Sequence, residues 1–121
     1  MHEEVRLALP ATAAHVRLAR LTVASIAAEL GFSFDAIEDL RIAVDELCYL
    51  VGVGGPDGSI TLHFDIDDDA LVVTGEGAAR PRASEAARLS EQILAATVDR
   101  YELAATDGRV VCRLVRRREG T

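Results

Sequence analysis

The spacing of apolar residues changes abruptly along this chain, and the change restricts the folds that it can adopt. From about Ala11 to Val51, apolar residues recur every three or four positions, as on one face of an α-helix. After a glycine-rich break at 52–58, they alternate with polar residues over 60–66, which is typical of a half-buried β-strand. Helices and strands therefore share a chain of 121 residues, a length that fits one domain spanning residues 1–121.

The other segments follow the same two patterns. Ser33 or Asp35 can cap the second helix, and the dipeptide Asp107-Gly108 favours a tight hairpin turn. The predicted order is β-α-α-β-β-α-β-β, with elements at about 5–9, 11–30, 35–51, 60–66, 70–74, 84–98, 101–105 and 109–115. Hairpins beside helices predict an α+β fold, a two-layer sandwich with a mixed, mainly antiparallel sheet and helices on one face. The third helix is predicted to bury a stripe formed by Ala86, Leu89, Ile93, Leu94 and Thr97.

Missing residue types exclude several kinds of chemistry. The chain has no Lys, which excludes a P-loop lysine or a Schiff-base lysine, and it has no Asn. Its three His are scattered, and Cys48 and Cys112 form no CxxC pair, so we predict no metal site and two reduced, buried thiols. No apolar run reaches the ~18–20 residues of a membrane span, and the acidic start lacks the pattern of a signal peptide. We therefore expect a cytoplasmic protein with no membrane contact.

Charge is unevenly distributed along the chain. The formal net charge of −7 argues against nucleic acid as a direct partner. Ten acidic residues lie between Asp35 and Asp69 against Arg41 alone, whereas five Arg and no acid lie between Arg109 and Arg118. Two interpretations remain open: solvated faces or a frayed tail, or surfaces that select partners of opposite charge.

Two helical segments resemble a known family. Residues 18–24, LARLTVA, look like the first helix of the anti-sigma factors that double as serine-protein kinases. Residues 40–47, LRIAVDEL, resemble their second helix, where the ATP-binding N-box lies. Together with the order of the elements, these motifs make residues 5–77 similar to that branch of the histidine-kinase-like (GHKL) ATPase fold.

The resemblance implies an N-box of the form Glu-x-x-x-Asn. Its Glu serves as a base or orients water, and its Asn oxygen holds the magnesium that bridges the phosphates of ATP. Glu46 matches the first position, but Leu50 stands at the second, and the chain has no Asn that a shifted register could supply. A Leu offers no oxygen to a cation that requires oxygen ligands. We therefore assign no catalytic residue and expect Glu46 to be a remnant.

The resemblance also implies a second box, Asp-x-Gly-x-Gly, whose Asp receives the adenine amino group. Gly75 and Gly77 match the two glycines, but Val73 stands at the Asp position. The short segment after Gly77 leaves no room for the family's lid and its later phosphate-binding loop. Although the family implies ATP and magnesium as cofactors, these departures predict that nucleotide binding is weak or lost.

The first helix keeps the features that the family uses to bind proteins. The Arg that matches Arg20 lies in the surface that contacts the sigma factor and its antagonist, and Arg17, His15 and Ala13 lie at helical spacing from it. We expect an exposed basic patch that includes Arg17 and Arg20, although a solvated Arg on an amphipathic helix explains the pattern equally well. The resemblance further implies a homodimer, formed through the sheet or the first helix.

Three functions follow from these residues. The first is an anti-sigma-factor-like regulator with a degenerate ATP site, which binds a sigma factor, an anti-anti-sigma protein, or both. The second is an active serine-protein kinase of the same fold, with Glu46 as base. The third is a scaffold or dimerisation module that binds no sigma factor.

Overall fold

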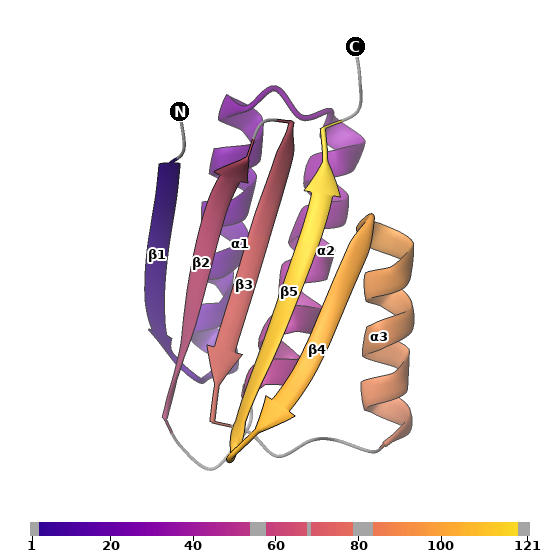
Figure 1. The fold of residues 1–121 in the computed structure, drawn as a ribbon. Helices are drawn as coiled ribbons and strands as arrows, with labels where there is room; N and C mark the ends of the chain where they lie inside the picture. Colours follow the sequence, from indigo (N-terminus) through magenta and orange to yellow (C-terminus); the bar gives the residue numbers. More distant parts are fainter. Residues whose placement is uncertain (1–2, 54–57, 68, 79–83, 119–121) are drawn as a thin grey trace.

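Three helices cover one face of a five-stranded sheet in the computed structural model, which describes residues 3–53, 58–67, 69–78 and 84–118 (Figure 1). The elements are β1 (Glu3–Pro10), α1 (Ala13–Glu29), α2 (Phe34–Val51), β2 (Ser59–Asp67), β3 (Ala70–Gly77), α3 (Glu85–Thr97), β4 (Arg100–Thr106) and β5 (Arg109–Arg117). The predicted order and the two-layer architecture are therefore confirmed.

The sheet has the strand order β1-β2-β3-β5-β4, and every neighbouring pair of these strands is antiparallel. It is thus antiparallel throughout its described strands, where the sequence suggested a mixed sheet. The predicted Asp-Gly hairpin is confirmed, because Asp107 (φ 52°) and Gly108 (φ 76°) both adopt the positive φ that a two-residue type I′ turn requires.

Local signals fix the ends of the first two helices. Gly31, with φ 82°, follows α1 directly after the cap residue Leu30. The hydroxyl of Ser33 then accepts a hydrogen bond from the backbone N–H of Ala36 (3.1 Å), so Ser33 is the N-cap of α2. The short connection makes α1 and α2 antiparallel neighbours on the sheet, side by side in Figure 1.

The core lies between the helical layer and the inner face of the sheet. The inward alternation predicted for β2 is confirmed, because its apolar positions are buried or half-buried and face α1 and α2. The largest fully buried side chains of the core are Phe64, Leu40, Leu47, Ile60, Leu62, Leu71, Leu94 and Leu114.

The stripe predicted for α3 was wrong at two positions. Ala86 and Leu89 are exposed, with Leu89 retaining 56% of its accessible surface. The buried face of α3 is instead formed by Ala87, Ser90, Leu94 and Thr97. This face can include two hydroxyl residues because each hydroxyl forms a hydrogen bond. Ser90 donates to Glu46, and Thr97 donates to the carbonyl oxygen of Ile93 (2.8 Å).

Folding pairs most of the C-terminal arginines with acids from other elements. Four of the five arginines in the run from Arg109 to Arg118 form ion pairs, and the run is a strand of the sheet followed by Arg118, not a frayed tail. The pairs are Arg109–Glu76, Arg113–Glu102, Arg116–Asp39 and Arg118–Asp69. These arginines are therefore close together in the sequence but do not form a continuous positively charged surface.

Candidate functional site

Helix α2 brings the two predicted N-box positions to one side, because a spacing of four residues is about one helical turn. On that side the Ser90 hydroxyl of α3 donates a 2.7 Å hydrogen bond to Oε1 of Glu46. Leu50, one turn further along, is 4% exposed and belongs to the apolar core. The side of α2 that the family resemblance assigns to a nucleotide is thus occupied here by a hydroxyl of the chain itself and by a buried apolar side chain.

Gly75 and Gly77 lie where α2 touches β3, and both are needed for that contact. A Cβ atom on Gly75 would collide with Cδ2 of Leu47, and one on Gly77 would collide with the backbone carbonyl oxygen of Val51. Neither glycine has a positive φ, so close approach and not backbone conformation explains them. The two glycines that match the second box therefore have a packing role that requires no ligand.

Val73 occupies the position where the family has an Asp. It is fully buried in β3, between Phe64 of β2 and Leu114 of β5 in the register of the sheet. Its side chain offers no acceptor to an adenine amino group. Within the described parts of the chain, moreover, no three His, Cys, Asp or Glu side chains lie close enough to hold a metal ion. Neither Val73 nor Leu50 therefore offers an oxygen to adenine or to a magnesium ion.

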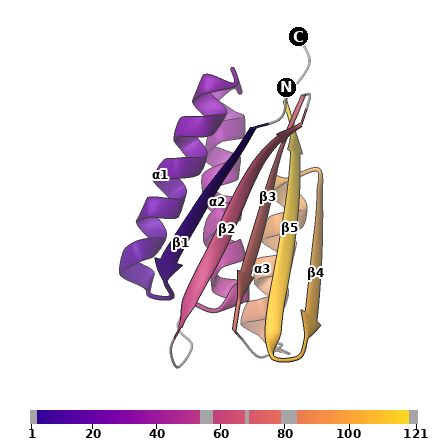
Figure 2. The ribbon, with the colours of Figure 1, turned by 60° about the vertical axis from the view of Figure 1, so that its left-hand side comes forward.

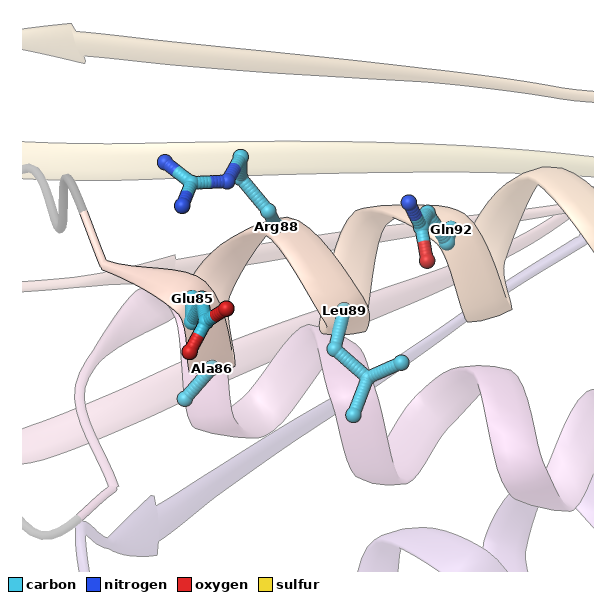
Figure 3. A pocket seen from close by; sticks show the side chains of 5 residues that line it. All are labelled: Glu85, Ala86, Arg88, Leu89 and Gln92. Atoms are coloured by element: carbon cyan, nitrogen blue, oxygen red, sulfur yellow. The ribbon is translucent and has the colours of Figure 1, made fainter.

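A hollow of about 370 Å³ lies elsewhere, along the start of α3 (Figure 3). It is lined by Glu85, Ala86, Arg88, Leu89 and Gln92. Ala86 and Leu89 belong to the stripe predicted for α3, whereas the other three belong to no motif singled out in the sequence. In Figure 3 the side chains of Ala86 and Leu89 point to the side of α3 on which α2 is drawn, and that of Arg88 points the opposite way. Leu89 is exposed and lines this hollow. Nothing in the sequence indicated this, because the periodicity of apolar residues placed Leu89 in the core.

The sequence predicts an exposed basic patch on α1 that includes Arg17 and Arg20, and in the structure these two residues differ in exposure and pairing. Nη1 of Arg20 lies 2.6 Å from Oδ1 of Asp45 on α2, and the Arg20 side chain is 31% exposed. The His15 ring bonds to the hydroxyl of Thr12 at the start of the helix (2.8 Å), whereas Arg17 is exposed. Arg20 is paired because α1 and α2 are antiparallel neighbours, which brings position 20 beside position 45.

The two cysteines are buried on facing layers of the core, Cys48 in α2 and Cys112 in β5. Burial raises the pKa of each thiol from 9.0 to about 12. Both are therefore neutral thiols at physiological pH, as the sequence predicted, and poor nucleophiles.

Comparison with known proteins now identifies the family. The histidine kinase-like ATPase domain matches residues 9–109. The chain belongs to this family. It is 43% identical over 77 residues to the serine-protein kinase RsbW of Listeria innocua, which covers 60% of this chain and 49% of that protein. The match to RsbW of Bacillus cereus is 35% over 74 residues, covering 59% of this chain and 46% of that protein.

A solved structure confirms the histidine kinase-like fold. The crystal structure of the RsbU and RsbW domains of a Mycobacterium tuberculosis protein matches with a TM-score of 0.78 at 18% identity, covering 95% of this chain and 32% of that one. The resemblance to the anti-sigma and serine-protein kinase branch, predicted from two helix motifs, is confirmed by the RsbW relatives. The chain spans about half the length of these curated relatives.

Among the described residues, no helix is both long and apolar enough to cross a bilayer.

Proposed function

We propose that this chain is an anti-sigma-factor-like regulator that acts in the cytoplasm by binding proteins and does not depend on ATP. Its partners are a sigma factor, an anti-anti-sigma protein, or both, and it works as a homodimer. The observation that supports this most directly is the hydrogen bond from Ser90 to Glu46, next to the buried Leu50.

A carboxylate that serves as a general base must face the hydroxyl from which it takes a proton. Glu46 instead accepts from Ser90, which is 4% exposed and therefore closed to a substrate protein. Phosphoryl transfer also depends on metal ions that neutralise the developing charge. Leu50 and Val73 supply no ligand for such an ion or for adenine. Without phosphorylation of an antagonist, release of the sigma factor follows from competition, which requires only different affinities for the two partners.

Arg20 and Arg17 on α1 are the residues that we assign to partner binding. Nη1 of Arg20 is held by Asp45, but a guanidinium has five N–H donors. The pair with Asp45 therefore fixes the orientation of Arg20 and leaves donors for a carboxylate of the partner. Arg17, exposed about one turn earlier, extends the same surface of α1.

Calorimetric titration with ATP and magnesium, to millimolar concentrations, tests the nucleotide part. RsbW of Listeria innocua is the control of related sequence. We expect heat from RsbW and none from this chain, and no rise in the melting temperature of this chain with ATP. Micromolar binding to this chain would contradict the proposal and favour the kinase alternative, which transfer of labelled phosphate to an anti-anti-sigma protein would then test.

Binding to the sigma factors of the source organism, with and without ATP, tests the partner part. We expect one of them to bind equally well in both conditions, and Arg17→Ala and Arg20→Ala each to weaken binding about tenfold. Arg88→Ala, on the exposed surface of α3, is the matched control and should change affinity less than about twofold. If neither a sigma factor nor an anti-anti-sigma protein binds, the scaffold or dimerisation alternative is favoured.

A further inference from the structure

A groove lies at the β1 edge of the sheet, and no residue of the matched family motifs lines it. It has a volume of about 540 Å³ and lies between α1 and the edge strand β1, which Figure 2 shows next to each other. Four apolar side chains and two carboxylates line it: Val5, Ile26, Leu30, Ile66, Glu4 and Glu29. The apolar four are only half-buried or exposed, so their surface is available to a binding partner.

Strand β1 also offers backbone hydrogen bonds beside this groove. It pairs with β2 on one side, and no described strand pairs with its other side. An edge strand presents a row of N–H and C=O groups that can pair with an added strand. Peptides that bind in this way gain affinity from the backbone bonds and specificity from the pockets that receive alternate side chains.

The charge at the groove selects the kind of side chain that fits. Among the described residues, the Glu29 carboxylate has no hydrogen bond or ion pair, and the Glu4 carboxylate pairs with His63 alone, through its Oε2 atom (3.1 Å). Arg118 approaches the end of α1 and donates to the carbonyl of Leu30, but its other Nη lies 3.1 Å from a carboxylate oxygen of Asp69. Two carboxylates beside an apolar groove therefore favour a partner that has a cationic side chain next to an apolar one.

We propose that this groove binds an extended segment of a partner protein, added as a strand to the free edge of β1. An apolar side chain of the segment occupies the space between Val5 and Ile26, and an Arg or Lys lies beside Glu4 and Glu29. A second copy of this chain fits the charge less well, because each copy has a net charge of −7. The proposal requires neither a sigma factor nor the absence of ATP, and it requires of the proposed homodimer only that the free edge of β1 lies outside the dimer interface.

A labelled peptide of alternating valine and arginine is the probe, and a peptide of alternating valine and glutamate is its control. Fluorescence anisotropy measures binding, and hydrogen exchange reports on the amides of β1. We expect the arginine peptide to bind, the glutamate peptide to bind at least about tenfold more weakly, and the β1 amides to exchange more slowly in the complex.

Two variants of the chain and one control variant locate the site. Glu29→Lys should weaken the arginine peptide about tenfold, and a cation there also suits the C-terminal end of a helix, so folding is preserved. Glu85→Lys makes the same change of charge at the start of α3, outside the groove, and should leave affinity within about twofold. Val5→Thr keeps the β-branched shape of the side chain but removes apolar surface, and should weaken binding about threefold.

Three outcomes would overturn the proposal. Equal losses in Glu29→Lys and Glu85→Lys would indicate non-specific attraction between charges. Unchanged exchange of the β1 amides would exclude strand addition. A dimer in solution whose β1 amides are already protected, and which Val5→Thr dissociates, would show that a second copy occupies the groove.

Discussion

Helices α1 and α3 flank α2 on opposite sides, yet they bury different kinds of side chain against it (Figure 1). The buried face of α1 is entirely apolar: Val16, Ala19, Val23 and Ala27. That of α3 includes Ser90 and Thr97, and hydrogen bonds hold it in place. Arg116 of β5 adds to these, because its Nη1 donates both to Asp39 of α2 (3.0 Å) and to the carbonyl of Thr97 (2.7 Å).

This difference supports the proposal that the chain does not depend on a nucleotide. Apolar burial fixes α1 and α2 on the sheet, as in any two-layer domain. The polar contacts of α3 lie on the side of α2 where the family resemblance places ATP, so contacts within the chain order this side. Changes in the apolar part should therefore cost the most stability, and changes at α3 should cost less and act locally.

The largest effect is expected at the contact between α2 and β3. Gly77→Ala should lower the free energy of unfolding by about 3 kcal/mol or more, because the new methyl group meets a backbone carbonyl that cannot move aside. Gly75→Ala should cost about 1–3 kcal/mol, because the obstacle is the movable side chain of Leu47. Urea denaturation measures both.

The pair Gly75→Ala and Leu47→Ala tests this explanation. If the collision is with Leu47, the double variant should lose less stability than the sum of the single variants. Strict additivity would show that the explanation is wrong.

The next largest effect is expected at alkaline pH, which should destabilise the apolar core that contains the two cysteines. Because burial raises the pKa of Cys48 and Cys112 from 9.0 to about 12, the unfolded chain releases these protons above pH 9 while the folded chain retains them. The free energy of unfolding should fall between pH 9 and pH 12, by about 1.4 kcal/mol per pH unit for each thiol. Urea denaturation at pH 8, 9 and 10 measures the slope.

Cys112→Ala should remove about half of that slope. Tyr101→Phe is the comparison from the β4 side, because burial, with a hydrogen bond to Glu91, raises the pKa of Tyr101 as well. A slope that Cys112→Ala leaves unchanged would exclude the Cys112 thiol as one of its origins.

Arg116→Ala should have a smaller effect, about 2 kcal/mol, since it leaves the Thr97 carbonyl without its charged donor. Arg116→Lys should recover part of the loss, because an ammonium can reach one of the two acceptors. Arg117→Ala is the matched control on the exposed neighbour and should stay within about 0.5 kcal/mol. Thermal denaturation distinguishes these values, and equal losses at the two positions would contradict the role of Arg116.

The smallest effect is expected for Ser90→Ala, about 1 kcal/mol, because water can replace the hydroxyl at the half-buried Glu46. Hydrogen exchange should accelerate mainly in α3. Ser25→Ala on the exposed surface of α1 is the control and should be neutral. Faster exchange throughout the sheet would contradict this prediction, because it would show that loss of the Ser90 hydroxyl destabilises the whole fold and not mainly α3.

Sequence patterns were reliable where one element decides the outcome. The order of elements and the Asp107-Gly108 turn follow from neighbouring residues, and both are observed. Of the two caps that the sequence offered for α2, Ser33 and Asp35, the structure uses Ser33. The α3 stripe failed because periodicity weights Leu89 above Ser90. Which of the two is buried depends on Glu46, which lies 44 residues from Ser90.

By itself, the sequence determined which residue types are present at each motif position. Leu50 and Val73 lack the oxygens that magnesium and adenine need wherever the chain places them, since this is a property of the side chains. Only the tertiary structure decided the partners: Glu46 with Ser90, Arg20 with Asp45, and the C-terminal arginines with acids of other elements. It also gave Gly75 and Gly77 their packing role. The reason is physical: these contacts join residues far apart in the chain, and packing of the helices on the sheet is what brings them within a hydrogen bond of each other.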